Sequence, residues 1–152
     1  MSLELKAGPT SLERLETAIA RMTQKHGFER VDRSDAAFPA GLCALLLTDD
    51  PQRNLEVLDA CVILPEALKA LGDGIARRVA GPDVAPALMQ AYGVARAPAV
   101  VFLRDGSFQG VLPGIRDWAE YRTEVERLLA GPAQPRPIAI PVVAASTPGA
   151  CA

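Results

Sequence analysis

The sequence has no C-x-x-C motif, although it contains three cysteines, Cys43, Cys61 and Cys151. Three widely spaced cysteines in 152 residues do not form a disulfide framework, and the single histidine, His26, is far from all of them in sequence. Zinc sites need cysteine and histidine ligands at short, regular spacings. The sequence therefore predicts reduced thiols, no metal site and no bound cofactor.

Two further classes of protein are disfavoured by what the chain lacks. The formal net charge is only −2 and the basic residues are dispersed, which argues against a nucleic-acid partner. No apolar run is long enough to span a bilayer, and the first fifteen residues contain no apolar signal core. We therefore expect a cytoplasmic protein without stable membrane insertion.

The length and composition suit one folded domain followed by a tail. Hydrophobic residues make up 49% of the chain, which is enough to build one core. From residue 132 onward, proline recurs too often for a helix or a central strand. We expect a domain over residues 1–131 and a mobile tail over 132–152. The alternative is that residues 138–143 dock as an edge strand.

Apolar periodicity and capping signals give the expected order of elements. Thr10 and Glu13 form a capping box, and the continuous apolar run at residues 42–47 is typical of a strand covered on both faces. Pro65 lies inside a helical pattern and should kink that helix. In order, we expect a helix at 11–25, strands at 28–31 and 42–47, a helix at 59–71, a strand at 75–80, a helix at 84–92, strands at 99–103 and 108–112, and a helix from 117 to 130.

Residues 92–118 carry the most specific pattern. A helix end is followed by the Ala97-Pro98 step, an apolar strand, an Asp105-Gly106 pair that suits a type I′ turn, and a second strand. We assign turn geometry to Gly110 and Gly114. The pattern resembles the C-terminal half of a thioredoxin domain. That resemblance implies an α/β, thioredoxin-like fold, with a central mixed sheet flanked by helices and a cis peptide at Ala97-Pro98.

A narrower resemblance is carried by the segments LLLTDDPQRN, CVILPEALKAL, FLRDG and GIRDWAEY. They are similar to the hydrogenase accessory proteins of the HyaE/HupG/HoxO type, which are thioredoxin-like but lack the redox dithiol. The resemblance implies a non-enzymatic chaperone in [NiFe] hydrogenase maturation. Its partners would be the small-subunit precursor, through its twin-arginine signal peptide, and other hydrogenase accessory proteins. An aromatic residue commonly precedes the proline in this family, whereas this chain has Ala97.

The position of the thioredoxin dithiol can be located by counting. Counting forward from the strand at 42–47 places it at residues 51–54, and counting backward from Pro65 places it at 57–60. Neither window contains a cysteine, and leucines replace the buried carboxylate that assists proton transfer in thioredoxins. The sequence therefore predicts no disulfide reductase activity.

Cys61 leaves a second class of function open. It lies near the start of the second helix, where the helix dipole can lower a thiol pKa, and a single-cysteine thiol enzyme would use it. The alternative is that Cys61 is a small buried apolar residue. A third function is a scaffold module that acts through the tail in a maturation complex.

Carboxylates gather between the strand at 42–47 and the second helix, with Arg53 as the one basic residue among them. Such a group is either a solvated surface or an acidic rim that receives the paired arginines of a signal peptide, since arginine–carboxylate pairing is directional. Pro98 would lie beside it and offer backbone contacts to an extended segment. The carboxylates are Asp49, Asp50, Glu56, Asp59 and Glu66. The predicted peptide-binding residues are Asp49, Asp50, Glu56, Asp59 and Pro98.

Overall fold

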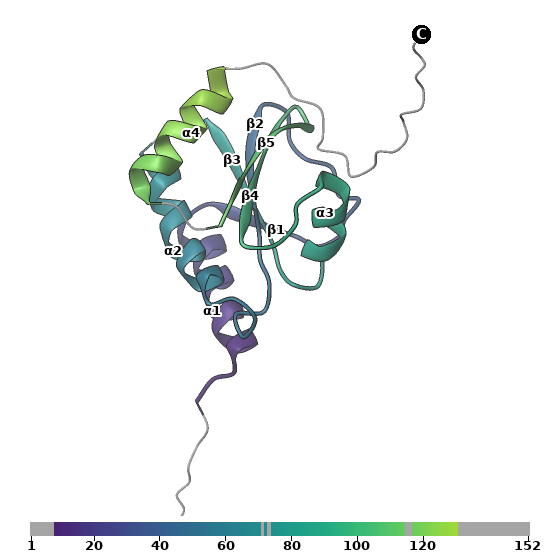
Figure 1. Ribbon diagram of the computed structural model, residues 1–152, viewed down its shortest axis with the longest axis vertical. Helices are drawn as coiled ribbons and strands as arrows, with labels where there is room; N and C mark the ends of the chain where they lie inside the picture. The colour runs from purple at the N-terminus through teal and green to yellow at the C-terminus, as the bar shows by residue number, and fades with distance from the viewer. Residues whose placement is uncertain (1–7, 71, 73, 115–116, 131–152) are drawn as a thin grey trace, which may run out of the picture.

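A five-stranded mixed sheet with helices on both faces organises the chain (Figure 1). The computed structural model describes residues 8–70, 72, 74–114 and 117–130. The elements are α1 (Ser11–Lys25), β1 (Phe28–Val31), β2 (Leu42–Leu47), α2 (Glu56–Lys69), β3 (Ile75–Ala80), α3 (Ala85–Tyr92), β4 (Ala99–Arg104), β5 (Ser107–Pro113) and α4 (Trp118–Ala130). The strands lie in the order β1-β3-β2-β4-β5. The first three are parallel, and β4 and β5 run antiparallel to their neighbours. This is the thioredoxin-like fold that the sequence predicts.

Strand β2 lies at the centre of the sheet, as its apolar run indicates. It pairs with β3 on one side and β4 on the other, and its residues from Cys43 to Leu47 are fully buried. Successive side chains of a strand point to opposite faces of the sheet, so β2 contributes to the core on both sides. Ala44 and Leu46 belong to one core cluster, whereas Cys43 and Leu45 belong to the other.

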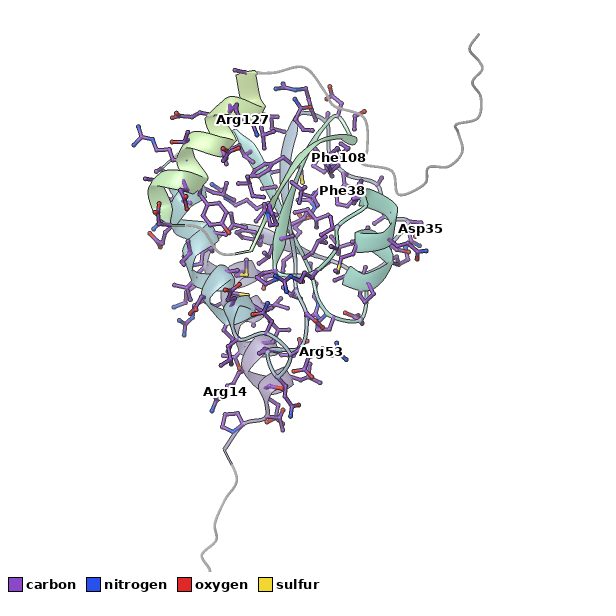
Figure 2. All side chains as sticks on the ribbon, viewed as in Figure 1. Arg14, Asp35, Phe38, Arg53, Phe108 and Arg127 are labelled. Atoms are coloured by element: carbon purple, nitrogen blue, oxygen red, sulfur yellow. The ribbon has the colours of Figure 1, made fainter. Side chains whose placement is uncertain are left out.

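The helices divide unequally between the two faces. Helices α1, α2 and α4 cover one face and α3 covers the other, as Figure 1 shows. On the α3 face, Tyr92 stacks on Phe108 with ring centroids 6.0 Å apart, and Phe38 packs against the same cluster (Figure 2). The loop that precedes β2 thus helps α3 to cover this side of the sheet.

The start of α1 confirms the predicted capping box. The Glu13 amide donates to Thr10 Oγ1 over 3.1 Å, and the Thr10 amide donates to Glu13 Oε1 over 2.9 Å. These bonds satisfy backbone donors that have no partner within the helix.

Helix α2 begins three residues earlier than predicted, at Glu56 instead of Asp59. Asn54 explains the difference, because its side-chain oxygen accepts from the Glu56 amide over 2.9 Å. The Asn54 carbonyl also accepts from the Val57 amide over 3.2 Å. Asn54 therefore satisfies two backbone donors in the first turn from the position before the N-cap, Leu55, and Pro65 lies inside the helix as predicted.

The β4–β5 hairpin and the step before it agree with the sequence at most positions. Asp105 and Gly106 both have positive φ, as a type I′ turn requires, and the Ala97-Pro98 peptide is cis. Gly114 also has positive φ, as assigned. The assignment of turn geometry to Gly110 is wrong: Gly110 lies within β5, opposite Phe102. A Cβ there would approach Leu128 Cδ2 of α4 to 2.5 Å, so close helix–strand packing explains this glycine.

The predictions for the tail at residues 132–152 lie outside the described residues. Within the described part of the chain, every helix is too short or too polar to cross a bilayer.

Candidate peptide-binding groove

The two windows predicted for a thioredoxin dithiol, residues 51–54 and 57–60, lie in the loop before helix α2 and on its first turn. The count backward from Pro65 falls on its first turn, where Val57 and Ala60 are fully buried in the core. Apolar side chains therefore occupy both positions and pack inward. This part of α2 contributes to the core and presents no thiol to the surface.

Burial suppresses the reactivity of both described cysteines. Cys61 is 4% exposed, and burial raises the pKa of its thiol to about 12. Of the two alternatives for Cys61, the structure supports the small buried apolar residue, because desolvation of the thiolate raises the pKa. Burial also raises the pKa of the Cys43 thiol to about 11, although nearby Arg78 opposes the shift.

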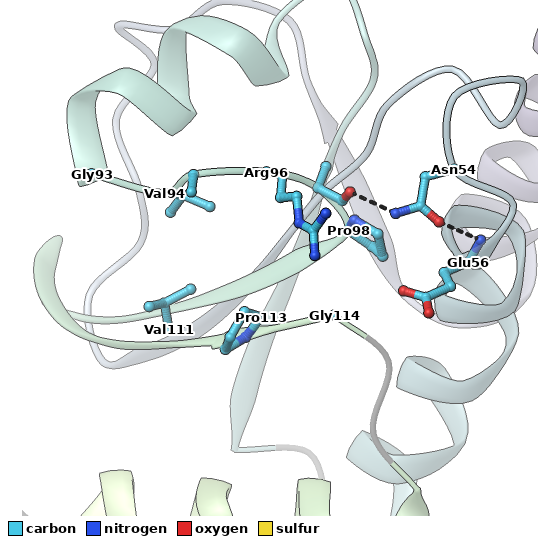
Figure 3. Close-up of a pocket in the computed structure, with 11 residues that line it drawn as sticks. Asn54, Glu56, Gly93, Val94, Arg96, Pro98, Val111, Pro113 and Gly114 are labelled. Atoms are coloured by element: carbon cyan, nitrogen blue, oxygen red, sulfur yellow. Dashed lines mark hydrogen bonds between the residues drawn. The ribbon is translucent and has the colours of Figure 1, made fainter.

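A groove of about 500 Å³ lies beside the Ala97-Pro98 step (Figure 3). Its walls come from the start of α2, the loop at residues 93–98 and the end of β5. Val94, Val111 and Pro113 give it an apolar side, and Glu56 gives it a carboxylate near α2. Segments that are far apart in sequence thus form one concave surface.

Two hydrogen bonds hold the proline loop in place. The Asn54 side-chain amide donates to the Ala97 carbonyl over 3.3 Å, and the Gly114 amide donates to the Pro98 carbonyl over 2.8 Å. Asn54 therefore links the start of α2 to the proline loop, in addition to accepting hydrogen bonds from the first turn of the helix. Both carbonyls at this step already accept a hydrogen bond from the protein, and proline has no amide hydrogen to offer.

The two acidic residues after β2 stabilise the following loop. Asp49 Oδ1 accepts from the Arg53 guanidinium and from the Asp50 amide, each over 2.7 Å. Asp50 Oδ1 accepts from the Ser11 hydroxyl over 2.6 Å and from the Gln52 amide over 2.9 Å. The Ser11 hydrogen bond is the main reason that the pKa of Asp50 is lowered. Both carboxylates therefore have partners within the protein.

The structure brings only some of the predicted residues together. Glu56 and Pro98 line the groove, whereas Asp59 is exposed one helical turn further along α2 and outside the lining. Asp49 lies in a separate hollow with Arg53, and Val94 borders both this hollow and the groove. The acidic group is thus spread over the end of β2, the loop and α2.

Two further features, one in the groove and one next to it, were missed from the sequence. Arg96 lines it, so a basic residue stands beside the expected acidic site. Leu55, next to Glu56, is 69% exposed. The position of Arg96 could have been predicted from the Arg96-Ala97-Pro98 run, because the residues directly before the proline belong to the same loop as the proline.

The fold and the residues around the start of α2 define the class: a thioredoxin-like protein without a cysteine in either dithiol window. Residues 18–121 match the family described as "Hydrogenase-1 expression protein HyaE". The chain belongs to this HyaE family of hydrogenase expression proteins.

Several relatives are named in agreement with the family. The chain is 37% identical over 139 residues to the hydrogenase expression/formation protein HoxO of Cupriavidus necator, covering 88% of this chain and 86% of the relative. It is 33% identical over 117 residues to HupG of Rhodobacter capsulatus, covering 74% and 84%. It is 36% identical over 118 residues to HoxO of Azotobacter vinelandii, covering 74% and 78%.

Proposed function

We propose that this chain is a non-catalytic accessory protein of hydrogenase maturation, which binds the precursor of the hydrogenase small subunit in the cytoplasm before export. Its ligand is the twin-arginine signal peptide, held in the groove beside Pro98. Family membership supports the role in maturation.

The observation that carries the proposal is the combination of an open groove and dithiol windows that contain no cysteine. The groove offers a carboxylate and an apolar wall to a ligand, while Val57 and Ala60 beside it are buried. Such a surface favours binding over thiol exchange, because exchange needs an accessible thiolate.

Charge supplies only part of the binding energy. Glu56 and Asp59 are exposed, and each pair with a client arginine is worth about 0.2–1 kcal/mol. Asp49 and Asp50 add to the negative potential, but both already have partners in the loop. Two arginines therefore cannot hold the client by charge alone.

Apolar contacts supply the remainder. Val94, Val111 and Pro113 form the apolar wall, and Leu55 stands exposed at the start of α2. Burying a leucine side chain fully is worth about 1.5–3 kcal/mol before ordering costs. We therefore expect binding to weaken as salt increases but to persist, since screening acts on the charged pairs and not on apolar burial.

Co-purification from cells that make the small-subunit precursor tests this function. Glu56→Lys and Leu55→Gln should each reduce the amount of precursor recovered. Two matched controls should not: Asp32→Lys reverses an exposed carboxylate on another surface, and Val62→Gln changes an exposed apolar residue, 61% accessible, further along α2. Equal recovery of a precursor that lacks its signal peptide would contradict the proposal.

A further inference from the structure

The groove carries opposite charges on its two walls. Glu56 stands at the α2 wall and Arg96 on the loop between α3 and β4, and both line the groove. Figure 3 shows the Arg96 guanidinium on one side of Pro98 and the Glu56 carboxylate on the other. Both residues are exposed, and neither forms an ion pair with any other residue that the structure describes.

The surface between these two charges is mostly apolar. Val94, Val111 and Pro113 are apolar, and the Ala97 and Pro98 carbonyls already accept hydrogen bonds from Asn54 and Gly114. Apolar contacts stabilise a bound segment in either direction, because burial of apolar surface does not depend on charge. The charged walls are therefore the groups that can set the direction of a segment.

We propose that Glu56 and Arg96 together select an extended peptide segment of mixed charge and fix its direction across Pro98. A basic side chain of the segment pairs with Glu56, and a carboxylate side chain pairs with Arg96. This inference rests on the proposed function, in which the groove binds the client's signal peptide. The reversed direction places like charges together at both walls, and such repulsion is a common source of specificity.

The same arrangement predicts that the two arginines of the client bind at the α2 end of the groove. Glu56 and Asp59 are three residues apart on α2 and so lie on the same side of the helix. Paired arginines at this end meet Glu56 in the groove lining and Asp59 one helical turn beyond it, whereas at the other wall they meet Arg96. The acidic residue of the client therefore lies on the far side of Pro98 from its arginines.

The test uses a fluorescently labelled synthetic peptide of the client's signal segment, amidated at its C-terminus so that side chains are its only carboxylates. Its dissociation constant is measured by fluorescence anisotropy with the unmodified protein, Arg96→Glu and Glu56→Lys, and with Arg21→Glu as a matched reversal on the exposed side of α1. A second set of peptides carries one Asp→Lys or Glu→Lys change each.

Arg96→Glu should raise the dissociation constant about 3- to 10-fold, because a surface attraction becomes a repulsion of similar size. Arg21→Glu should leave it unchanged. One acid-to-lysine peptide should bind the unmodified protein more weakly and regain affinity for Arg96→Glu. Coupling of this kind identifies the carboxylate that faces Arg96.

Two results would overturn the inference. In the first, Glu56→Lys weakens binding but Arg96→Glu leaves it unchanged or tightens it, or no changed peptide regains affinity for Arg96→Glu. The segment is then not oriented by Arg96, and the proposed function holds without this inference. If the peptide does not bind the unmodified protein, the proposed function fails and this inference fails with it.

Discussion

Alkylation of Cys61 should be extremely slow in the folded protein. Burial raises the pKa of this thiol to about 12, so at pH 8 only about one molecule in 10,000 carries the thiolate. An unperturbed thiol with a pKa of about 8.5 is roughly one-quarter ionised at the same pH. The ionisation difference alone slows alkylation about two-thousand-fold, and the 4% exposure of Cys61 slows it further.

Iodoacetamide labelling followed by peptide mapping measures this directly. Mapping separates Cys61 from Cys43, whose pKa of about 11 predicts similar protection, and from Cys151. The same protein unfolded in urea gives the rate for an unperturbed thiol. In the folded state the rate should rise about tenfold for each unit of pH between 7 and 10, because the thiolate fraction grows in that proportion below the pKa.

A Cys61 rate within about tenfold of the unfolded rate at pH 8 would refute this reasoning, because it would require an accessible thiolate of ordinary pKa. That result would favour the single-cysteine thiol enzyme over a binding protein. An insulin-reduction assay that shows turnover lost in Cys61→Ser would support the same conclusion.

Three further predictions concern stability and titration. Gly110→Ala should destabilise the domain by about 1–2 kcal/mol in urea unfolding, because its Cβ would crowd Leu128, and the cost should shrink in a Leu128→Val background. Ser11→Ala should raise the pKa of Asp50 in an NMR titration. The contribution of this hydrogen bond to stability should be present above the ordinary carboxyl pKa of about 4 and be lost as the pH falls through the lower pKa of folded Asp50. Deletion of residues 132–152 should shift Tm by less than about 4 °C, and a larger drop would mean that the tail docks.

Local signals in the sequence were sufficient to predict much of the fold. The Thr10 capping box, the apolar run of β2 and the Asp105-Gly106 turn are each defined by a few adjacent residues, and each is found in the structure. The start of α2 was misplaced because Leu55 and Glu56 show no usual cap, although Asn54 just before them accepts from the Glu56 amide.

The candidate site was harder to predict, because it depends on contacts between distant segments. The hydrogen bond from Ser11 to Asp50 spans 39 positions in the chain, and the one from Asn54 to Ala97 spans 43. Neither contact follows from residue spacing. The choice between the two readings of Cys61 could not be made from the sequence for a related reason, since its burial depends on the packing of α1, α2 and the sheet.

Isothermal titration of the purified chain with the hydrogenase small-subunit precursor, with and without its signal peptide, tests the proposed function most directly. We predict saturable binding of the precursor, weakened by added salt and by Glu56→Lys, and loss of most of the affinity when the signal peptide is removed. Equal affinity for the two forms, unaffected by Glu56→Lys, would show that the groove beside Pro98 is not where the client binds.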